Sequence, residues 1–310
     1  MTAIIILNWN GADDTIMCLE SLAKGGGAFF VVVVDNGSAD DSVKRLREYK
    51  EKSSLDIRLL ELERNYGFAG GNNRGVKLAS RENPDAYLLL NNDTEVTPGF
   101  LERLESFIGA HKEYSILTPR INYYFDKDII WNCGGVLRFG FRRYKYAGCS
   151  ERKVSEADYL RISFVTGCAL FVLPTVLEPD GTLLTERFFF GEEDFDFSMR
   201  MRKRGLKMAC VMDSVIYHKI GSAGNMMAKS GKVYLHLLNR YIDIRLNSGR
   251  LFSFVWRVIS FPLTMRSLKK AFGPQAMKKY RRLLSDMRSK DSVDRSVFES
   301  LVIKGDYFNE

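Results

Sequence analysis

Three adjacent polar side chains follow an apolar run in the segment YLLLNNDTEV, residues 87–96. Asn91, Asn92 and Asp93 end this run, although a buried strand needs no such residues for packing. A carboxylate here can bind a divalent cation, because Mg²⁺ and Mn²⁺ prefer oxygen ligands and leave positions open for phosphates. The neighbouring amides can bind sugar or ribose hydroxyl groups. The segment therefore predicts a strand end that presents ligands, with a plain turn as the alternative.

A second polar tip follows the apolar run FFVVVV, residues 29–34. Asp35 could accept the imide N–H of a pyrimidine, a contact for which adenine has no matching donor, and Asn36 lies beside it. The alternative is an Asx-turn or a helix cap, both common for D-N-G-S sequences. In the capping interpretation, Ser38 caps the next helix, and Asp41, three residues later, completes a capping box.

The segment NYGFAGGNNRG, residues 65–75, contains four glycines and three asparagines before the helical pattern VKLAS. We expect a loop whose backbone N–H groups approach a phosphate or ribose, with Gly67, Gly71 and Asn73 as candidate contacts. The spacing matches neither the phosphate-loop motif nor the dinucleotide-binding motif. Taken alone, this glycine-rich segment is weak evidence for binding.

A second acidic cluster opens the segment GEEDFDFSMRMRKRG, residues 191–205. Its alternating apolar residues are typical of a strand, but acidic residues at the start, basic residues at the end and a final glycine favour a helix. We expect Glu193 and Asp194 in its first turn. The preceding three phenylalanines, 188–190, would partly desolvate a carboxylate and raise its pKa toward that of a general base. Charge complementarity with the helix dipole is the alternative.

One of the three histidines, His218, ends the strand-like run KMACVMDSVIY. A lone histidine is more often structural than a ligand, but this one would lie at the same end of the sheet as Asp93. His111 and His236 lie in helical patterns and receive no chemical role.

Apolar strand patterns at residues 3–7, 29–34, 56–62 and 86–90 alternate with helical patterns, which predicts a doubly wound, parallel α/β sheet. In such sheets ligands bind beyond the carboxyl ends of the strands. We therefore expect one crevice to be surrounded by Asn8, Asn10, Asp35, Asn36, Asn91, Asn92 and Asp93. Residues 121–159 are aromatic, basic and irregular, typical of a hairpin or a mobile loop. Beyond Asn225 the pattern becomes helical.

The basic character of the chain belongs to this last part. Residues 226–310 contain 17 Lys and Arg against 7 Asp and Glu, a balance of +10, whereas residues 1–225 balance at −2. Such a tail attracts an anionic partner, unless it is simply a solvated helical surface. The five scattered cysteines include no C-x-x-C pair and favour a reduced, cytosolic protein without structural zinc. We expect no signal peptide and no membrane span.

Seven segments in order resemble bacterial family-two glycosyltransferases of the GT-A fold, with the rhamnosyltransferase-like branch nearest: LNWN, VDNGS, NYGFAGGNNRG, LLNNDTEV, VTGCALFV, GEEDFDFSMRMRKRG and YHKIGS. The resemblance spans residues 2–225. It implies an inverting transfer from a UDP- or dTDP-activated sugar, with dTDP-rhamnose as one candidate. The acceptor would be a saccharide hydroxyl on a lipid-linked or cell-surface polysaccharide intermediate.

The resemblance also implies roles for individual residues. Asp35 would bind the pyrimidine, Asp93 would bind Mn²⁺ or Mg²⁺ with help from His218, and Asp194, beside Glu193, would be the catalytic base. The metal motif departs from the family pattern because Asn91-Asn92-Asp93 has a single carboxylate, so cation affinity is expected to be modest.

We expect residues 1–225 to form the catalytic domain and residues 226–310 a helical region for acceptor, membrane or oligomer contacts, a homodimer among them. The protein is expected in the cytoplasm, peripherally bound at the inner face of the cytoplasmic membrane. Two alternatives stay open. A sugar-phosphate nucleotidyltransferase would normally place its glycine-rich signature after the first strand, and a nucleic-acid-binding protein would leave the acidic clusters without a purpose.

Overall fold

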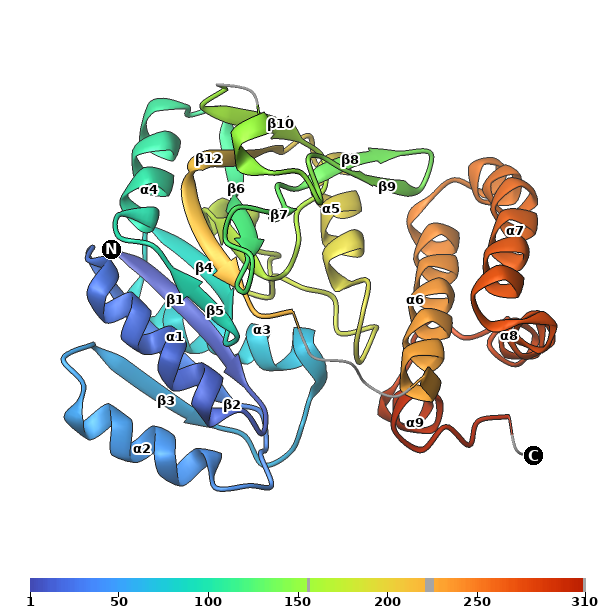
Figure 1. Cartoon of the computed structure of the whole chain (residues 1–310), viewed down its shortest axis with the longest axis horizontal. Helices are drawn as coiled ribbons and strands as arrows, with labels where there is room; N and C mark the ends of the chain where they lie inside the picture. The colour runs from blue at the N-terminus through green and yellow to red at the C-terminus, as the bar shows by residue number, and fades with distance from the viewer. Residues whose placement is uncertain (155–156, 221–225, 309–310) are drawn as a thin grey trace.

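The computed structural model describes residues 1–154, 157–220 and 226–308, and it has a sheet domain followed by a set of helices (Figure 1). The strands are β1 (Thr2–Asn8), β2 (Phe29–Asp35), β3 (Ile57–Glu61), β4 (Ala86–Asn91), β5 (Thr94–Val96), β6 (Tyr114–Tyr123), β7 (Ile130–Asn132), β8 (Gly135–Arg138), β9 (Phe141–Tyr144), β10 (Tyr159–Ile162), β11 (Ala169–Val172) and β12 (Lys207–His218). The helices of the sheet domain are α1 (Ala12–Gly25), α2 (Ser42–Lys52), α3 (Gly67–Ala79), α4 (Phe100–Ala110) and α5 (Glu193–Lys203).

The main sheet is mixed, with the strand order β10-β12-β6-β11-β4-β1-β2-β3. The half built from β3, β2, β1 and β4 is entirely parallel, as the alternating pattern predicts. In its register Asn8 lies opposite Asp35, and Leu7 lies opposite Asn91, so three strands end at one level. The polar tips that follow these strands therefore meet at one edge of the sheet.

Helices cover both faces of the sheet because its strands are apolar on both sides. One core contains Ile4 and Val33 with residues of α1, α2 and α4. The other contains Ile5 and Val34 with residues of α3 and α5. Two-sided burial explains the continuous apolar runs in the sequence.

The glycine-rich segment is a correction to the sequence prediction, because residues from Gly67 onward form α3 and not a loop. A Cβ built at Gly75 would lie 2.6 Å from Ile5 Cγ2 and 2.8 Å from Val34 Cγ2, and one at Gly71 would collide with Leu7 Cδ1. These glycines let the helix backbone lie directly on the sheet. Close packing, and not flexibility, accounts for their number.

Other expected elements are confirmed. The irregular middle contains the β8–β9 hairpin. The chain from Met226 onward forms α6 (Met226–Asn247), α7 (Arg250–Phe272), α8 (Pro274–Asp286), α9 (Arg295–Phe298) and a π-helical turn, η4 (Glu299–Lys304). Within the three described ranges, no helix combines the length and apolarity that a bilayer crossing requires.

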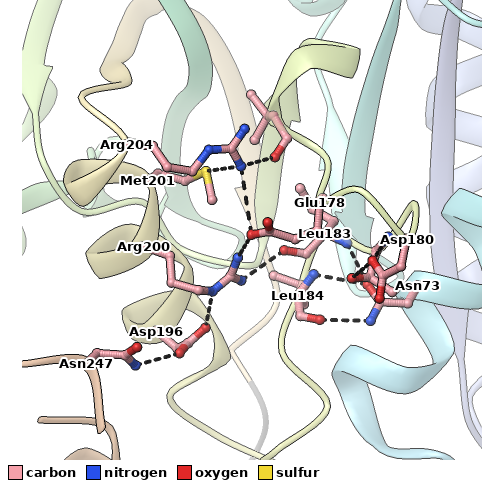
Figure 2. A network of polar contacts seen from close by, with 12 residues as sticks. Asn73, Glu178, Asp180, Leu183, Leu184, Asp196, Arg200, Met201, Arg204 and Asn247 are labelled. Atoms are coloured by element: carbon pink, nitrogen blue, oxygen red, sulfur yellow. Dashed lines mark hydrogen bonds and ion pairs between the residues drawn. The ribbon is translucent and has the colours of Figure 1, made fainter.

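Helix α6 attaches the C-terminal helices to α5. Asn247 donates to Asp196 Oδ1 at 2.9 Å, and the other oxygen of Asp196 accepts from Arg200 at 2.6 Å (Figure 2). Arg200 also contacts Glu178, so α5 is held from two sides. This network fixes the helix that presents Asp194.

Candidate functional site

A cavity of about 370 Å³ lies at the carboxyl ends of the central strands. Five of the residues predicted from the sequence line it: Asn36, Gly67, Asn91, Asn92 and Asp93. A crevice is therefore present at the predicted edge, but Asn8, Asn10 and Asp35, which were also expected around it, are not among its lining residues. Its other walls include Trp9, two phenylalanines that precede α5, and four residues from the C-terminal helices: Lys232, Phe298, Val302 and Ile303. The tail thus closes one side of the crevice.

Asp93 and His218 come together where β4 and β12 end. His218 Nε2 lies 3.1 Å from Asp93 Oδ1, and β12 reaches this point by pairing with β5, where His218 lies opposite Thr94. Burial disfavours the charged imidazole, but Cys168 and Asp93 outweigh it and raise the pKa of His218 to about 10. The sequence therefore placed His218 correctly beside Asp93.

These two side chains fit a divalent cation held jointly with a ligand. In the described part of the chain the buried atoms Asp93 Oδ1 and His218 Nδ1 have no hydrogen bond apart from the 3.1 Å contact between Asp93 Oδ1 and His218 Nε2. Residues 1–154, 157–220 and 226–308 contain no cluster of three or more His, Cys, Asp or Glu ligands. A cation here would therefore take its other ligands from water and from substrate phosphates, as Mg²⁺ commonly does.

Asp35 is almost completely buried, and its carboxylate has three donors. They are Asn8 Nδ2 at 2.8 Å, the Ser38 N–H at 2.9 Å and the Ser38 hydroxyl at 2.6 Å. Ser38 therefore holds Asp35 in a turn and does not cap α2, which begins at Ser42. An ionised carboxylate has about four acceptor positions, so these three donors leave about one unused, although Asp35 does not line the cavity.

Asn8 has no exposed surface, and its carbonyl accepts from Thr15 at 2.8 Å, so it supports Asp35 from within. Asn10 lies at the surface, where its side-chain oxygen accepts the Ala39 N–H at 2.8 Å. Asn36 bonds to residues 65–67 at the start of α3.

Asn73 bonds to another part of the protein. Its side chain accepts from the N–H groups of Leu183 and Leu184 and donates to the Leu184 carbonyl, as Figure 2 shows. Together with Gly71, which packs on Leu7, it belongs to the face of α3 that is buried against other elements. The structure thus brings neither Gly71 nor Asn73 into the lining of the cavity.

Glu193 and Asp194 occupy the first turn of α5, as predicted. Burial raises the pKa of Asp194, and Arg142 opposes it from 3.5 Å. Glu193 Oε1 accepts the Gly191 N–H at 2.7 Å, and burial raises the pKa of Glu193 to about 8. Asp194, whose side chain is 21% exposed, is therefore the more accessible of the two carboxyl groups, since Glu193 is buried and already bonded.

The sequence does not indicate the groups that surround this pair. Glu192, fully buried and in a left-handed conformation, lies 2.7 Å from Arg142, 3.1 Å from His236 Nδ1 and 2.6 Å from Arg240 Nε. Burial alone would raise the pKa of Glu192, but its contacts with Arg240, His236 and Arg142 lower it to about 2. His236 had received no role because its helical pattern gave no sign of this contact. In the sequence, only the adjacent acidic residues in GEED and the basic residues in RFGFRRYKY indicate that ion pairs could form here.

The three phenylalanines before α5 pack mainly against the C-terminal helices. Phe188 belongs to their core, and the rings of Phe189 and Phe190 lie 5.1 and 5.6 Å from that of Phe298. The pKa of Asp194 is raised by burial, in the expected direction. The ring contacts serve to fix the loop that leads into α5.

Asn239, from α6, holds the same loop by its backbone. Its side chain donates to the carbonyls of Phe190 and Gly191 at 3.0 and 2.8 Å. Helix α6 thus supplies Asn239, His236 and Arg240 to the surroundings of Asp194. The C-terminal helices form part of this site.

Comparisons with known proteins indicate the family and the fold of the chain. The family model described as "Glycosyl transferase family 2" matches residues 3–171. The chain is 29% identical over 245 residues to the low-salt glycan biosynthesis hexosyltransferase Agl10 of Haloferax volcanii, covering 77% of this chain and 74% of that one.

Solved structures share the fold at low sequence identity. They include the mannosyltransferase PcManGT from Pyrobaculum calidifontis in complex with GDP-Man and Mn²⁺, with a TM-score of 0.58, 14% identity, and 94% and 76% of the two chains covered. GalNAc-T7 with UDP, GalNAc and Mn²⁺ matches with a TM-score of 0.62, 15% identity, and 94% and 58% covered. S. aureus TarS 1-349 matches with a TM-score of 0.55, 17% identity, and 98% and 81% covered. The chain has the GT-A fold and belongs to glycosyl transferase family 2.

Proposed function

We propose that the chain transfers a sugar, with inversion, from a UDP- or dTDP-activated donor to a saccharide hydroxyl. The observation that carries this proposal is that one edge of the sheet presents Asp93 with His218, while α5 presents Asp194, whose pKa is raised by burial. Inversion needs one displacement at the anomeric carbon, and hence one base and no covalent nucleophile.

In this mechanism Asp194 accepts the proton of the acceptor hydroxyl as its oxygen attacks the face opposite the departing diphosphate. Arg142 favours the ionised form of the base, and Glu193 fixes the turn through Gly191. Mn²⁺ or Mg²⁺, held by Asp93 and His218, would neutralise charge on the leaving diphosphate. Asp35 would accept the pyrimidine imide, and Asn36, Asn91 and Asn92 would bind the donor's hydroxyl groups, with Gly67 in the cavity wall.

The donor sugar is the first thing to test. The purified chain would be incubated with UDP-, dTDP- and GDP-sugars, dTDP-rhamnose and GDP-mannose among them, and the released nucleotide diphosphate would be measured with and without chelator. We expect metal-dependent release from one pyrimidine nucleotide sugar, and at least about 100-fold slower acceptor-dependent release from the Asp194→Asn variant. Release from no nucleotide sugar, or activity with a sugar phosphate and a nucleoside triphosphate, would overturn the proposal. The latter result would identify a nucleotidyltransferase.

We also propose that the helical region, residues 226–310, contacts an anionic membrane surface at the inner face of the cytoplasmic membrane. Helix α7 supports this, because it has five basic and no acidic residues. Its exposed apolar side chains are Leu251, Phe252, Phe254, Val255, Val258, Ile259, Phe261 and Leu263. Such a helix can lie in a bilayer interface. Two copies meeting through this face would bring like charges together, which disfavours the homodimer alternative.

A further inference from the structure

A groove of about 580 Å³ lies between α6, α7 and α8, apart from the crevice that contains Asp93. Six aromatic residues contribute to its lining: Phe141, Tyr241, Phe254, Trp256, Phe261 and Tyr280. Its size and its apolar, aromatic wall are typical of sites for small ligands. The sheet domain contributes to it through Phe141, at the start of β9.

The polar part of this groove is cationic. Arg240, Arg257 and Arg288 line it, and no acidic residue does. Arg240 is already paired with Glu192. Arg257 bonds to the Ser253 carbonyl and the Tyr241 hydroxyl, and neither it nor Arg288 forms an ion pair with a carboxylate of residues 1–154, 157–220 or 226–308. The guanidinium groups of Arg257, which is partly buried, and Arg288, which is exposed, can therefore bind an anion beside the apolar groove.

We propose that this groove binds a single-chain anionic amphiphile, an alkyl or isoprenyl chain that ends in a phosphate. The chain would lie against the aromatic wall, and the phosphate would lie at Arg257 and Arg288, because guanidinium groups bind phosphate by paired hydrogen bonds. The exposed apolar face of α7 borders the groove, so the chain could enter directly from a bilayer.

The groove adjoins the catalytic base through β9 and α6. Phe141 lines the groove and its neighbour Arg142 contacts Asp194, while Arg240 lines the groove and contacts Glu192. In this proposal a saccharide attached to the bound phosphate would extend from the side of the groove where Phe141 and Arg240 lie. This use of the groove, as the anchor of a lipid-linked acceptor, rests on the proposed function, whereas the binding site itself does not.

Isothermal titration calorimetry of the full chain would test the site. The probe is dodecyl phosphate below its critical micelle concentration. Dodecyl maltoside tests the alkyl chain without the phosphate, and inorganic phosphate tests the charge without the alkyl chain. We expect saturable binding of dodecyl phosphate alone. The double variant Arg257→Gln/Arg288→Gln should raise its Kd at least about tenfold, equivalent to about 1.4 kcal/mol. Lys269→Gln/Lys270→Gln removes the same charge from exposed positions of α7 outside the groove and should leave the Kd unchanged.

Equal binding of dodecyl maltoside, equal binding of inorganic phosphate, or equal losses in both double variants would overturn the proposal. Binding only to phosphatidylglycerol vesicles would also overturn it, because the ligand would then be the bilayer surface and not a chain in the groove. Donor hydrolysis, measured in parallel, should persist in the groove variant. Its absence from the wild type would count against the proposed function and would leave the binding result standing.

Discussion

Replacing Arg142 by Gln should move the acidic limb of kcat/KM to higher pH. Arg142 Nη1 lies 3.5 Å from Asp194 Oδ1, and the two side chains are only 18% and 21% exposed. Unit charges at this distance attract by about 5 kcal/mol at an effective dielectric constant of about 20. Arg142 also pairs with Glu192 at 2.7 Å, which neutralises part of its charge, so the net effect on Asp194 is smaller.

The direction of this pH shift follows from the opposing effects on the pKa of Asp194. Burial raises its pKa, and Arg142, His236 and Arg240 lower it, while Glu192 raises it further. Without the Arg142 guanidinium the pKa rises. A base must be ionised to accept a proton, so activity is lost as the pH falls through that pKa, and in the variant the loss begins at higher pH. A neighbouring guanidinium commonly lowers a carboxyl pKa by about 1–3 units, so a limb shift of at least about one unit is expected.

The assay is kcat/KM from released nucleotide diphosphate, measured across the acidic and neutral range. Arg142→Lys keeps the positive charge, so its acidic limb of kcat/KM should lie close to the pH of the wild-type limb. Arg143→Gln is the matched control, because Arg143 is the next residue of β9, and its side chain is exposed. If Arg142→Gln lowers activity equally at every pH and the limb stays in place, Arg142 only supports the structure and the electrostatic reasoning is wrong.

Three further tests address the base, the metal site and the tail. Asp194→Asn should lower kcat by at least about 100-fold with donor affinity unchanged, and more than about a tenth of wild-type kcat remaining would refute the assignment. Chelator should abolish activity and Mn²⁺ or Mg²⁺ restore it, while Asp93→Ala should weaken calorimetric binding of both cation and nucleotide; unchanged titrations would place the donor elsewhere. The chain should cosediment with anionic liposomes at low salt, but not at high salt or with neutral liposomes, and its absence from every pellet would mean that α7 does not bind membranes.

The sheet and its polar tips could be predicted because their signals are local. Continuous apolar runs define the buried parallel strands, and Asn8, Asp35 and Asn91 follow them directly, so topology alone brings them together. The pairing of Asp93 with His218 could also be predicted, since both lie where strands end.

The surroundings of Asp194 could not be predicted because they depend on long-range contacts. Glu192 meets Arg142, which lies 50 positions earlier, and Arg240, 48 positions later. His236 and Asn239 reach the same loop only because α6 packs there, and a helical pattern does not indicate which neighbour it faces. Lys232 lines the cavity beside Asp93 for the same reason.

The glycine-rich segment shows how a local signal can mislead, and it yields the last prediction. Gly75→Ala should destabilise the fold by about 1–3 kcal/mol, because the new Cβ would lie 2.6 Å from Ile5 Cγ2 and 2.8 Å from Val34 Cγ2 in a closely packed core. Gly109→Ala is the matched control. It is also a helical glycine, in α4, but a Cβ there meets no atom within 4 Å, so the better helix propensity of alanine should stabilise the chain by about 0.5–1 kcal/mol. Urea unfolding of both variants would measure the difference. If the segment were a loop that closes over a ligand, Gly75→Ala would leave the free energy of unfolding nearly unchanged and weaken nucleotide binding instead.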